Sequence, residues 1–124
     1  MKFCVIDDDA VSLKMLAKLL EKEGHEVVTE TSGARAVDTA ADFGAECIIT
    51  DLIMSPVDGL EVCQEVRRHR VLKTIPVIML SSNAEKRRYW QQRAEEFGAD
   101  GYMVKPVHPG FVKELEEVLA AVKR

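Results

Sequence analysis

The sequence contains little of what marks membrane, secreted or disulfide-stapled proteins. Its 124 residues include no apolar run that approaches the roughly 18 residues of a membrane-spanning helix. The three cysteines show no C-x-x-C spacing and no histidine at zinc-ligand spacing, which argues against a disulfide or a zinc site. We therefore expect reduced thiols in a packed core, a cytoplasmic location and no membrane contact.

The chain also has no excess of positive charge and no stretch rich in glycine, serine or proline. Its formal net charge is −4, so no general positive field would attract nucleic acid, and we expect no direct nucleic-acid contact. Because no linker divides the sequence, residues 1–124 are expected to form one domain. Apolar residues make up 47% of the chain, enough for a core in a domain of this length.

What the sequence does contain is a repeated alternation of short apolar runs and amphipathic stretches. It predicts strands at 3–6, 26–30, 46–50, 76–80 and 101–104, and helices at 10–23, 34–42, 58–68, 84–97 and 109–123. Alternating strands and helices indicate an α/β fold, a three-layer sandwich in which helices cover both faces of a parallel sheet. Unbroken apolar runs such as "CIIT" are typical of strands buried on both faces.

Polar residues of particular types follow four of the five predicted strands. They are carboxylates, a hydroxyl and an amine: Asp7, Asp8, Asp9, Asp51, Ser81 and Lys105. The second strand is followed by nothing comparable, only Glu30 and two hydroxyl residues. In open parallel sheets, ligands bind outside the carboxyl ends of the strands, so these residues are the candidate site.

The chemistry of such a cluster points to a metal ion and a phosphoryl group. Neighbouring carboxylates raise one another's pKa and are unfavourable unless a cation neutralises them. Mg²⁺ suits one or two carboxylates and fills its remaining positions with water and phosphate oxygens. An aspartate beside it can attack a phosphoryl group and form an acyl phosphate, while a lysine neutralises phosphoryl charge and a serine hydroxyl donates to a phosphoryl oxygen.

Four segments, in this order, resemble the response-regulator receiver domains of two-component signalling, the CheY-like family. They are "VIDDDAV" (5–11), "TDLIMSPVDG" (50–59), "MLSS" (79–82) and "GYMVKP" (101–106). The resemblance covers the whole chain. It implies a flavodoxin-like (βα)5 fold with strand order 2-1-3-4-5, and a receiver domain at 1–124 without an output domain. It also implies a signalling module that is no conventional enzyme and catalyses only its own aspartate phosphorylation and dephosphorylation.

The resemblance implies a role for each acidic site residue. Asp51 would accept the phosphoryl group. Asp7, Asp8 and Asp51 would hold Mg²⁺ together with the backbone carbonyl of Ile53, with Asp8 the closer ligand and Asp7 acting through water. The same reading gives Lys105 a contact with the phosphoryl group.

It also implies a switch and two kinds of partner. Ser81 would be drawn toward the phosphoryl group, and Tyr102 would move inward with it. A histidine kinase or histidine phosphotransfer protein would supply the phosphoryl group. A downstream effector protein or domain would dock on the surface formed by 84–97, 101–104 and 109–123. The Lys105–Pro106 bond is expected to be cis.

Several features depart from the family's usual pattern. Met54 is followed by Ser55 and only then by Pro56, so the loop after Asp51 is expected to follow a different path. The predicted helix at 84–97 is slightly longer than usual. Ile53 and Asn83 would flank the phosphoryl group, and because an aliphatic side chain cannot orient water, we expect slow self-dephosphorylation.

Other charged residues have simpler interpretations. Asp9, three residues before Ser12, and Asp58, before a glycine and a helical run, are expected to cap helices. The cations at 86–88 fit either a solvated helix face or a docking surface.

Two alternative functions remain from the sequence. "DDDAV" (7–11) also fits a haloacid-dehalogenase-type hydrolase, with Asp7 as nucleophile and Asp9 as acid/base. That reading leaves Asp51 without a role and lacks a cap domain. The only further acids after Lys105 lie on the last predicted helix: Glu114, Glu116 and Glu117. The other alternative is a receiver-like interaction module that works without phosphate.

Overall fold

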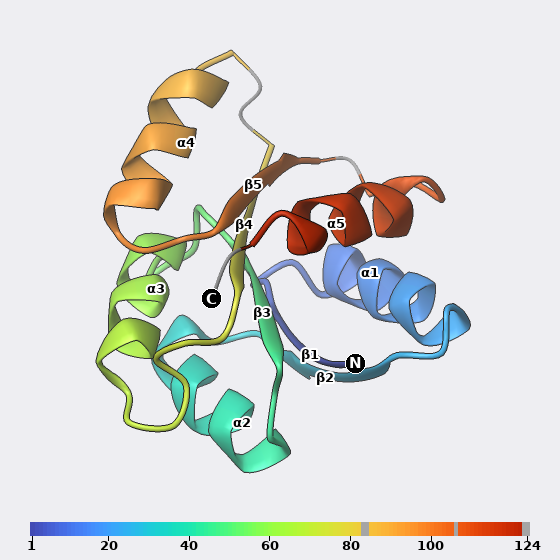
Figure 1. The fold of residues 1–124 in the computed structure, drawn as a ribbon, viewed down its shortest axis with the longest axis horizontal. Coiled ribbons are helices and arrows are strands. Elements are labelled where there is room, and N and C mark those ends of the chain that lie inside the picture. The colour runs from blue at the N-terminus through green and yellow to red at the C-terminus, as the bar shows by residue number, and fades with distance from the viewer. Residues whose placement is uncertain (83–84, 106, 123–124) are drawn as a thin grey trace.

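Five parallel strands form one sheet at the centre of the protein (Figure 1). They are β1 (Lys2–Ile6), β2 (Glu26–Glu30), β3 (Cys47–Asp51), β4 (Val77–Ser81) and β5 (Gly101–Val104). The fold comes from a computed structural model that describes residues 1–82, 85–105 and 107–122. The strand order β2-β1-β3-β4-β5 confirms the predicted flavodoxin-like topology.

Helices cover both faces of this sheet and make the predicted three layers (Figure 1). They are α1 (Ala10–Lys22), α2 (Ala36–Phe43), α3 (Gly59–Arg68), α4 (Arg87–Glu96) and α5 (Phe111–Ala120), with a short 3₁₀ turn, η1 (Gly33–Arg35), before α2. One core cluster joins α1 and α5 to the sheet, and a second joins α2, α3 and α4 to its other face.

Strand residues point alternately into these two clusters. In β3, Cys47 and Ile49 pack with α1 and α5, while Ile48 packs on the opposite side. Cys4, Cys47 and Cys63 are all buried and form no disulfide, as predicted. Burial raises the pKa of the Cys4 thiol to about 12, so it stays protonated and behaves as a core side chain.

Some element ends differ from the sequence prediction. Strands β3 and β4 begin and end one residue later than predicted, so that Asp51 and Ser81 are the last residues of their strands. Helix α4 begins at Arg87, after a turn that includes Lys86, and α5 begins at Phe111. The predictions of 84–97 and 109–123 were therefore too long, and residues 84 and 123 lie outside the described ranges. No side-chain hydrogen bond caps the first turn of either helix, which is where helix boundaries are least determined.

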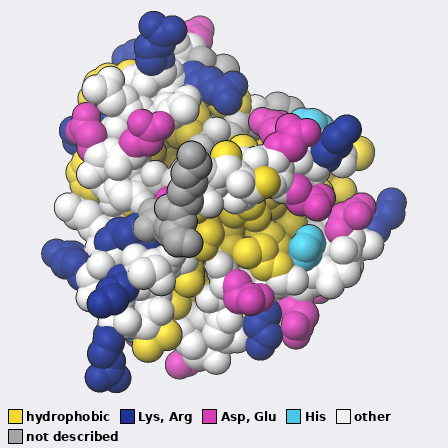
Figure 2. Space-filling model, in the orientation of Figure 1, with side chains coloured by type: hydrophobic (Ala, Val, Ile, Leu, Met, Phe, Trp, Pro, Cys, Tyr) yellow, Lys and Arg dark blue, Asp and Glu magenta, His cyan; other side chains and the backbone are white. Residues whose placement is uncertain are grey.

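The first turn of α4 is cationic and exposed. Arg87 and Arg88 in this turn and Lys86 just before it all lie on the surface, and Figure 2 shows Lys and Arg side chains gathered over this end of the helix. Within the described ranges, no helix is long and apolar enough to cross a membrane.

Candidate functional site

The carboxyl ends of four strands bring the predicted site residues to one edge of the sheet. We call this group the carboxyl edge: Asp7, Asp8, Asp51, Ser81 and Lys105. Asp7 and Ser81 are almost completely buried, Asp51 is nearly so, and Asp8 is exposed. Residues separated by almost a hundred positions in the sequence thus meet at one site.

Three carboxylates form the acidic part of this edge. One oxygen from each of Asp7, Asp8 and Asp51 lies within 4.8 Å of the others. This all-oxygen donor set suits a hard divalent cation such as Mg²⁺. The Ile53 side chain is 62% exposed and turns toward solvent, and a role for its carbonyl stays a prediction.

Lys105 provides the positive charge within the cluster. Its Nζ donates to Asp7 Oδ2 at 2.8 Å and lies 3.4 Å from Asp51 Oδ1. The other Asp7 oxygen accepts from the Asp9 N–H at 2.9 Å. Burial lowers the pKa of Lys105, but the hydrogen bond with Asp7 and the charge of Asp51 outweigh that and hold the pKa above its ordinary value. Lys105 therefore stays charged and offsets only part of the acidic cluster.

Asp51 keeps an unfavourable charge. Burial, and then the neighbouring charge of Asp7, raise its pKa from 3.8 to about 6, although Lys105 opposes this. At neutral pH the carboxylate is ionised in a site that does not fully stabilise it. A carboxylate in that state can act as a nucleophile and gains from a nearby cation.

Of the two switch residues predicted from the resemblance, Ser81 ends β4 at the carboxyl edge and Tyr102 lies within β5. The Ser81 carbonyl accepts from the Lys105 N–H at 2.8 Å, which joins the ends of β4 and β5. Tyr102 is 5% exposed and packs in the core cluster of α2, α3 and α4, so its ring already lies inward. Movement of either residue stays a prediction. Asn83 and the Lys105–Pro106 bond include positions outside the described residues.

Asp9 and Asp58 are helix caps, as predicted. Asp9 accepts from the Val11 N–H and from the Ser12 hydroxyl, both at 3.0 Å. The Ser12 hydrogen bond is the larger of the causes that hold the pKa of Asp9 below its ordinary value. Because both Asp9 oxygens are engaged in the cap, the geometry does not favour the acid/base role of the hydrolase alternative. Asp58 accepts from the Glu61 N–H at 2.9 Å and forms a capping box with it.

Gly59 brings helix α3 against the end of β3, a role the sequence did not reveal. Its N–H donates to the Leu52 carbonyl at 2.9 Å. A Cβ at this position would overlap the Asp51 carbonyl oxygen and lie 2.7 Å from the Met79 sulfur. Only glycine permits this approach, which the Asp-Gly pair in the sequence signalled merely as a turn. In the loop before Asp58, the Ser55–Pro56 peptide bond is cis.

Glu30, for which the sequence indicated no role, accepts several hydrogen bonds at the end of β2. Its carboxylate accepts from the Thr39 hydroxyl at 2.7 Å, the Ser32 N–H at 2.9 Å and Arg35 at 3.2 Å. Burial raises its pKa, but these hydrogen bonds outweigh burial and leave the pKa below its ordinary value. Glu30 is thus a structural group whose hydrogen bonds join the end of β2 to η1 and α2.

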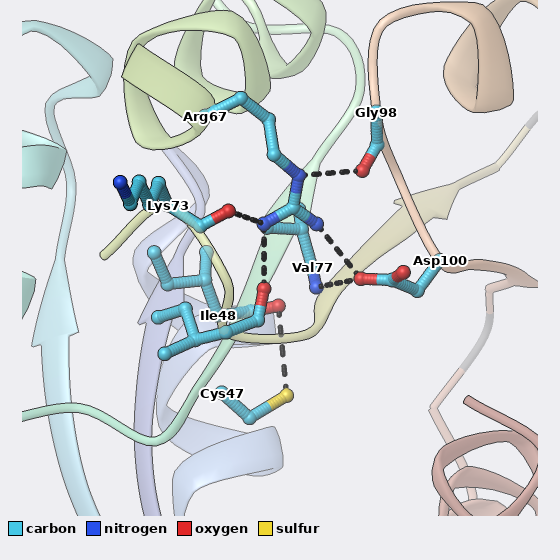
Figure 3. A network of polar contacts seen from close by, with 8 residues as sticks. Cys47, Ile48, Arg67, Lys73, Val77, Gly98 and Asp100 are labelled. Carbon is cyan, nitrogen blue, oxygen red and sulfur yellow. Dashed lines mark hydrogen bonds and ion pairs between the residues drawn. The ribbon is translucent and has the colours of Figure 1, made fainter. Parts of the chain in front are cut away.

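A second network that the sequence reading missed lies at the opposite edge of the sheet (Figure 3). Arg67, in the last turn of α3, donates to Asp100 Oδ2 at 2.8 Å and to the carbonyls of Gly98, Lys73 and Ile75. We call these groups, with the Val77 N–H, the amino edge. Local sequence patterns did not reveal this network, because the partners of Arg67 lie up to 33 residues away.

Comparison with known proteins agrees with this geometry. The profile of the "Response regulator receiver domain" family matches residues 3–117. Among curated relatives, the alkaline phosphatase synthesis transcriptional regulatory protein PhoP of Bacillus subtilis (strain 168) is 32% identical over 122 residues, or 98% of this chain and 47% of that protein. The transcriptional regulatory protein ResD of the same organism is 33% identical over 87% of this chain and 43% of its own length. The chain spans about half the length of these relatives.

Solved structures share the fold over nearly the full chain. The chemotaxis response regulator CheY4 of Vibrio cholerae has a TM-score of 0.86 and 30% identity, covering 94% of this chain and 97% of that one. A putative response regulator from Chloroflexus aurantiacus J-10-fl has a TM-score of 0.85 and 29% identity, covering 96% and 97%. The similarity therefore extends across all five strands and helices.

Proposed function

This chain belongs to the response regulator receiver domain family, and on that premise we propose that Asp51 accepts a phosphoryl group from a histidine kinase or histidine phosphotransfer protein. The observation that carries the proposal is the state of Asp51. It is a nearly buried carboxylate with a pKa of about 6, next to Asp7, Asp8 and a single lysine. A carboxylate whose charge is incompletely stabilised gains from binding a cation and can react with an electrophile.

In the proposed reaction, an Asp51 oxygen attacks phosphorus as the phosphorus–nitrogen bond of the donor imidazole breaks. Asp7, Asp8 and Asp51, with the Ile53 carbonyl, would hold Mg²⁺, which supplies charge neutralisation for the phosphoryl oxygens. The Lys105 ammonium, already 3.4 Å from Asp51, would pair with a phosphoryl oxygen. A hollow of about 340 Å³ lined by Ser82, Lys105 and Val107, among others, leaves room for a donor beside the lysine.

The acyl phosphate would act on the output surface through Ser81 and Tyr102. Tyr102 packs in the same cluster as Trp90 and Ala94 of α4, so a change at the carboxyl edge can reach α4 through contacts already made. We propose that it shifts a two-state equilibrium of the α4–β5–α5 surface, where an effector protein or domain docks. The exposed cations of the first turn of α4 belong to that surface.

The remaining proposals concern the wider role of the domain. It would work in the cytoplasm, without direct nucleic-acid contact, and would catalyse only its own phosphorylation and dephosphorylation. Because Ile53 is aliphatic and exposed beside Asp51, it cannot orient a water molecule for attack, so we expect slow self-dephosphorylation.

Trp90 provides the test. Its indole is partly buried against the cluster that contains Tyr102, so its fluorescence should report a change in that cluster. The protein is incubated with Mg²⁺ and beryllofluoride, a phosphoryl mimic, and then with acetyl phosphate. We expect a saturable fluorescence change that disappears in Asp51→Asn and without Mg²⁺, and that persists in Asp38→Asn, a matched change of an exposed aspartate on α2.

Other outcomes select the alternatives. If the response survives in Asp51→Asn but is lost in Asp7→Asn, with rapid phosphate turnover, the hydrolase is favoured and the proposal fails. If neither reagent produces a response in the folded wild-type protein, an interaction module that works without phosphate is the better description.

A further inference from the structure

The polarity of the residues in strand β5 does little to fix its register against β4. It has four residues and is the outermost strand of the sheet, paired with β4 alone. Tyr102 packs in one core cluster and Met103 in the other, so both faces are apolar and buried. A one-residue slip exchanges the two faces of a strand, and burial opposes the slip only when the faces differ in polarity. The polarity of the two faces therefore does not fix the pairing of β5 with β4, and contacts at the ends of the strand can contribute to it.

The amino edge contains groups that can do so (Figure 3). The Asp100 N–H donates to the Val77 carbonyl at 2.8 Å, and the Val77 N–H donates back to Asp100 Oδ2 at 2.9 Å. These two bonds hold the residue before β5 opposite the first residue of β4. The second of these bonds depends on the position of the Asp100 carboxylate.

Arg67 fixes that carboxylate in place. Its Nη2 donates to Asp100 Oδ2 at 2.8 Å, and its Nε donates to the Gly98 carbonyl at 2.9 Å. Its Nη1 reaches the Ile75 carbonyl at 2.7 Å, in the segment that leads into β4. One rigid guanidinium therefore grips the segments that begin both strands, a geometry that the single ammonium of a lysine cannot reproduce.

The other end of β5 is the carboxyl edge. Lys105 follows directly on Val104, and its ammonium reaches Asp7 at 2.8 Å and Asp51 at 3.4 Å. A strand rises about 3.3 Å per residue, so a slip of one position would carry Lys105 out of reach of both carboxylates and reverse its side chain. We propose that the Arg67–Asp100 pair sets the register of β5 and thereby positions Lys105 for phosphoryl transfer.

Arg67 and Asp100 are thus positioning residues, and their role rests on the proposed function of Lys105. The measurement is the rate of phosphorylation by acetyl phosphate with saturating Mg²⁺, at a temperature where each variant is folded by circular dichroism. Asp100→Ala removes the ion pair and the acceptor for Val77, whereas Asp100→Asn keeps an acceptor. We expect a rate about tenfold lower for Asp100→Ala and within about threefold of wild type for Asp100→Asn.

A matched control removes an ion pair that does not touch β5. Glu96 pairs with Arg93 at 3.2 Å on the exposed face of α4, so Glu96→Ala should leave the rate unchanged. If Asp100→Ala does not fold, Arg67→Lys replaces it as the test variant. Lysine keeps the positive charge but cannot form the several hydrogen bonds of the guanidinium. A folded Asp100→Ala or Arg67→Lys with the wild-type rate overturns the proposal.

The decisive comparison repeats Asp100→Ala in a Lys105→Met background. If the amino edge acts through Lys105, Asp100→Ala causes no further loss once Lys105 is gone. An equal further loss shows that Asp100 acts elsewhere and overturns this inference alone. If Lys105→Met itself phosphorylates at the wild-type rate, the proposed role of Lys105 fails, and the positioning role fails with it.

Discussion

The amino and carboxyl edges of the sheet both hold nearly buried ionised side chains, but only at the amino edge are the charges balanced by their hydrogen-bond and ion-pair partners. Side-chain exposure is similar, at 17% and 10% for Arg67 and Asp100, against 16% and 12% for Lys105 and Asp51. Burial is therefore not what separates the two edges. At the amino edge a guanidinium meets one carboxylate and three carbonyls, whereas at the carboxyl edge three carboxylates share one ammonium.

The comparison separates a structural ion pair from a reactive one. A buried pair whose hydrogen bonds are complete holds segments together, and removing one member leaves a buried charge without a partner. A buried cluster with surplus charge lowers stability and gains from binding a cation. Proteins break such local rules mainly at functional sites, so the surplus charge of the carboxyl edge supports the function proposed for it.

Removing the guanidinium at the amino edge should have the largest effect on stability. Arg67→Met strands the Asp100 carboxylate and leaves three carbonyls without their donor. We expect the free energy of unfolding to fall by about 3–5 kcal/mol, measured by urea denaturation.

Arg93→Met is the control, because the Arg93–Glu96 pair is 39% and 50% exposed and should contribute less than about 1 kcal/mol. Equal losses in the two variants would contradict the view that completed hydrogen bonds distinguish the amino edge.

At the carboxyl edge, removing a charge should stabilise the protein. Burial and Asp7 raise the pKa of Asp51 to about 6, so the folded protein binds that proton more tightly than the unfolded chain does. The stability this contributes is complete below pH 3.8 and is lost as the pH rises through about 6. At pH 8, Asp51→Asn should therefore be more stable than wild type by about 1–2 kcal/mol, after allowance for solvent screening.

The pH dependence provides the control for this variant. The advantage of Asp51→Asn should vanish near pH 4, where the wild-type carboxyl is protonated, and should shrink at pH 8 when Mg²⁺ is added. Urea denaturation at the two pH values measures it. A variant that is less stable than wild type at pH 8 would show that the Asp51 charge is well accommodated.

The helix-capping carboxylates should behave in the opposite way to Asp51. The Asp58 carboxylate accepts from the Glu61 N–H at the start of α3, so Asp58→Ala should lower the free energy of unfolding by about 1 kcal/mol. Thermal denaturation would measure this small loss beside Asp51→Asn. A gain in stability in Asp58→Ala would remove the distinction between capping carboxylates and the surplus carboxylates of the carboxyl edge.

Much of the carboxyl edge could be predicted from the sequence because its signals are local. Each site residue ends or follows an apolar run, and parallel strands place their ends together. The caps at Asp9 and Asp58 were predicted for the same reason, since each bonds an N–H within three residues. The similarity to a known family then added roles that spacing alone does not give.

The amino edge could not be predicted in this way. Arg67 and Asp100 lie 33 positions apart, and Arg67 shares the sequence "RRHR" with three other basic residues of similar appearance. Only the packing of α3 against the starts of β4 and β5 selects one of them. The close approach of Gly59 to Asp51 was missed for the same reason, because it depends on atoms brought together by the fold.

The central claim is that the surplus charge at the carboxyl edge serves phosphoryl transfer to Asp51. The most direct test is intact-mass analysis with peptide mapping after incubation with acetyl phosphate and Mg²⁺. We predict one phosphoryl group per chain, carried by the peptide that contains Asp51, absent without Mg²⁺ and absent in Asp51→Asn. A phosphoryl group that maps to Asp7, or that persists in Asp51→Asn, would contradict the account.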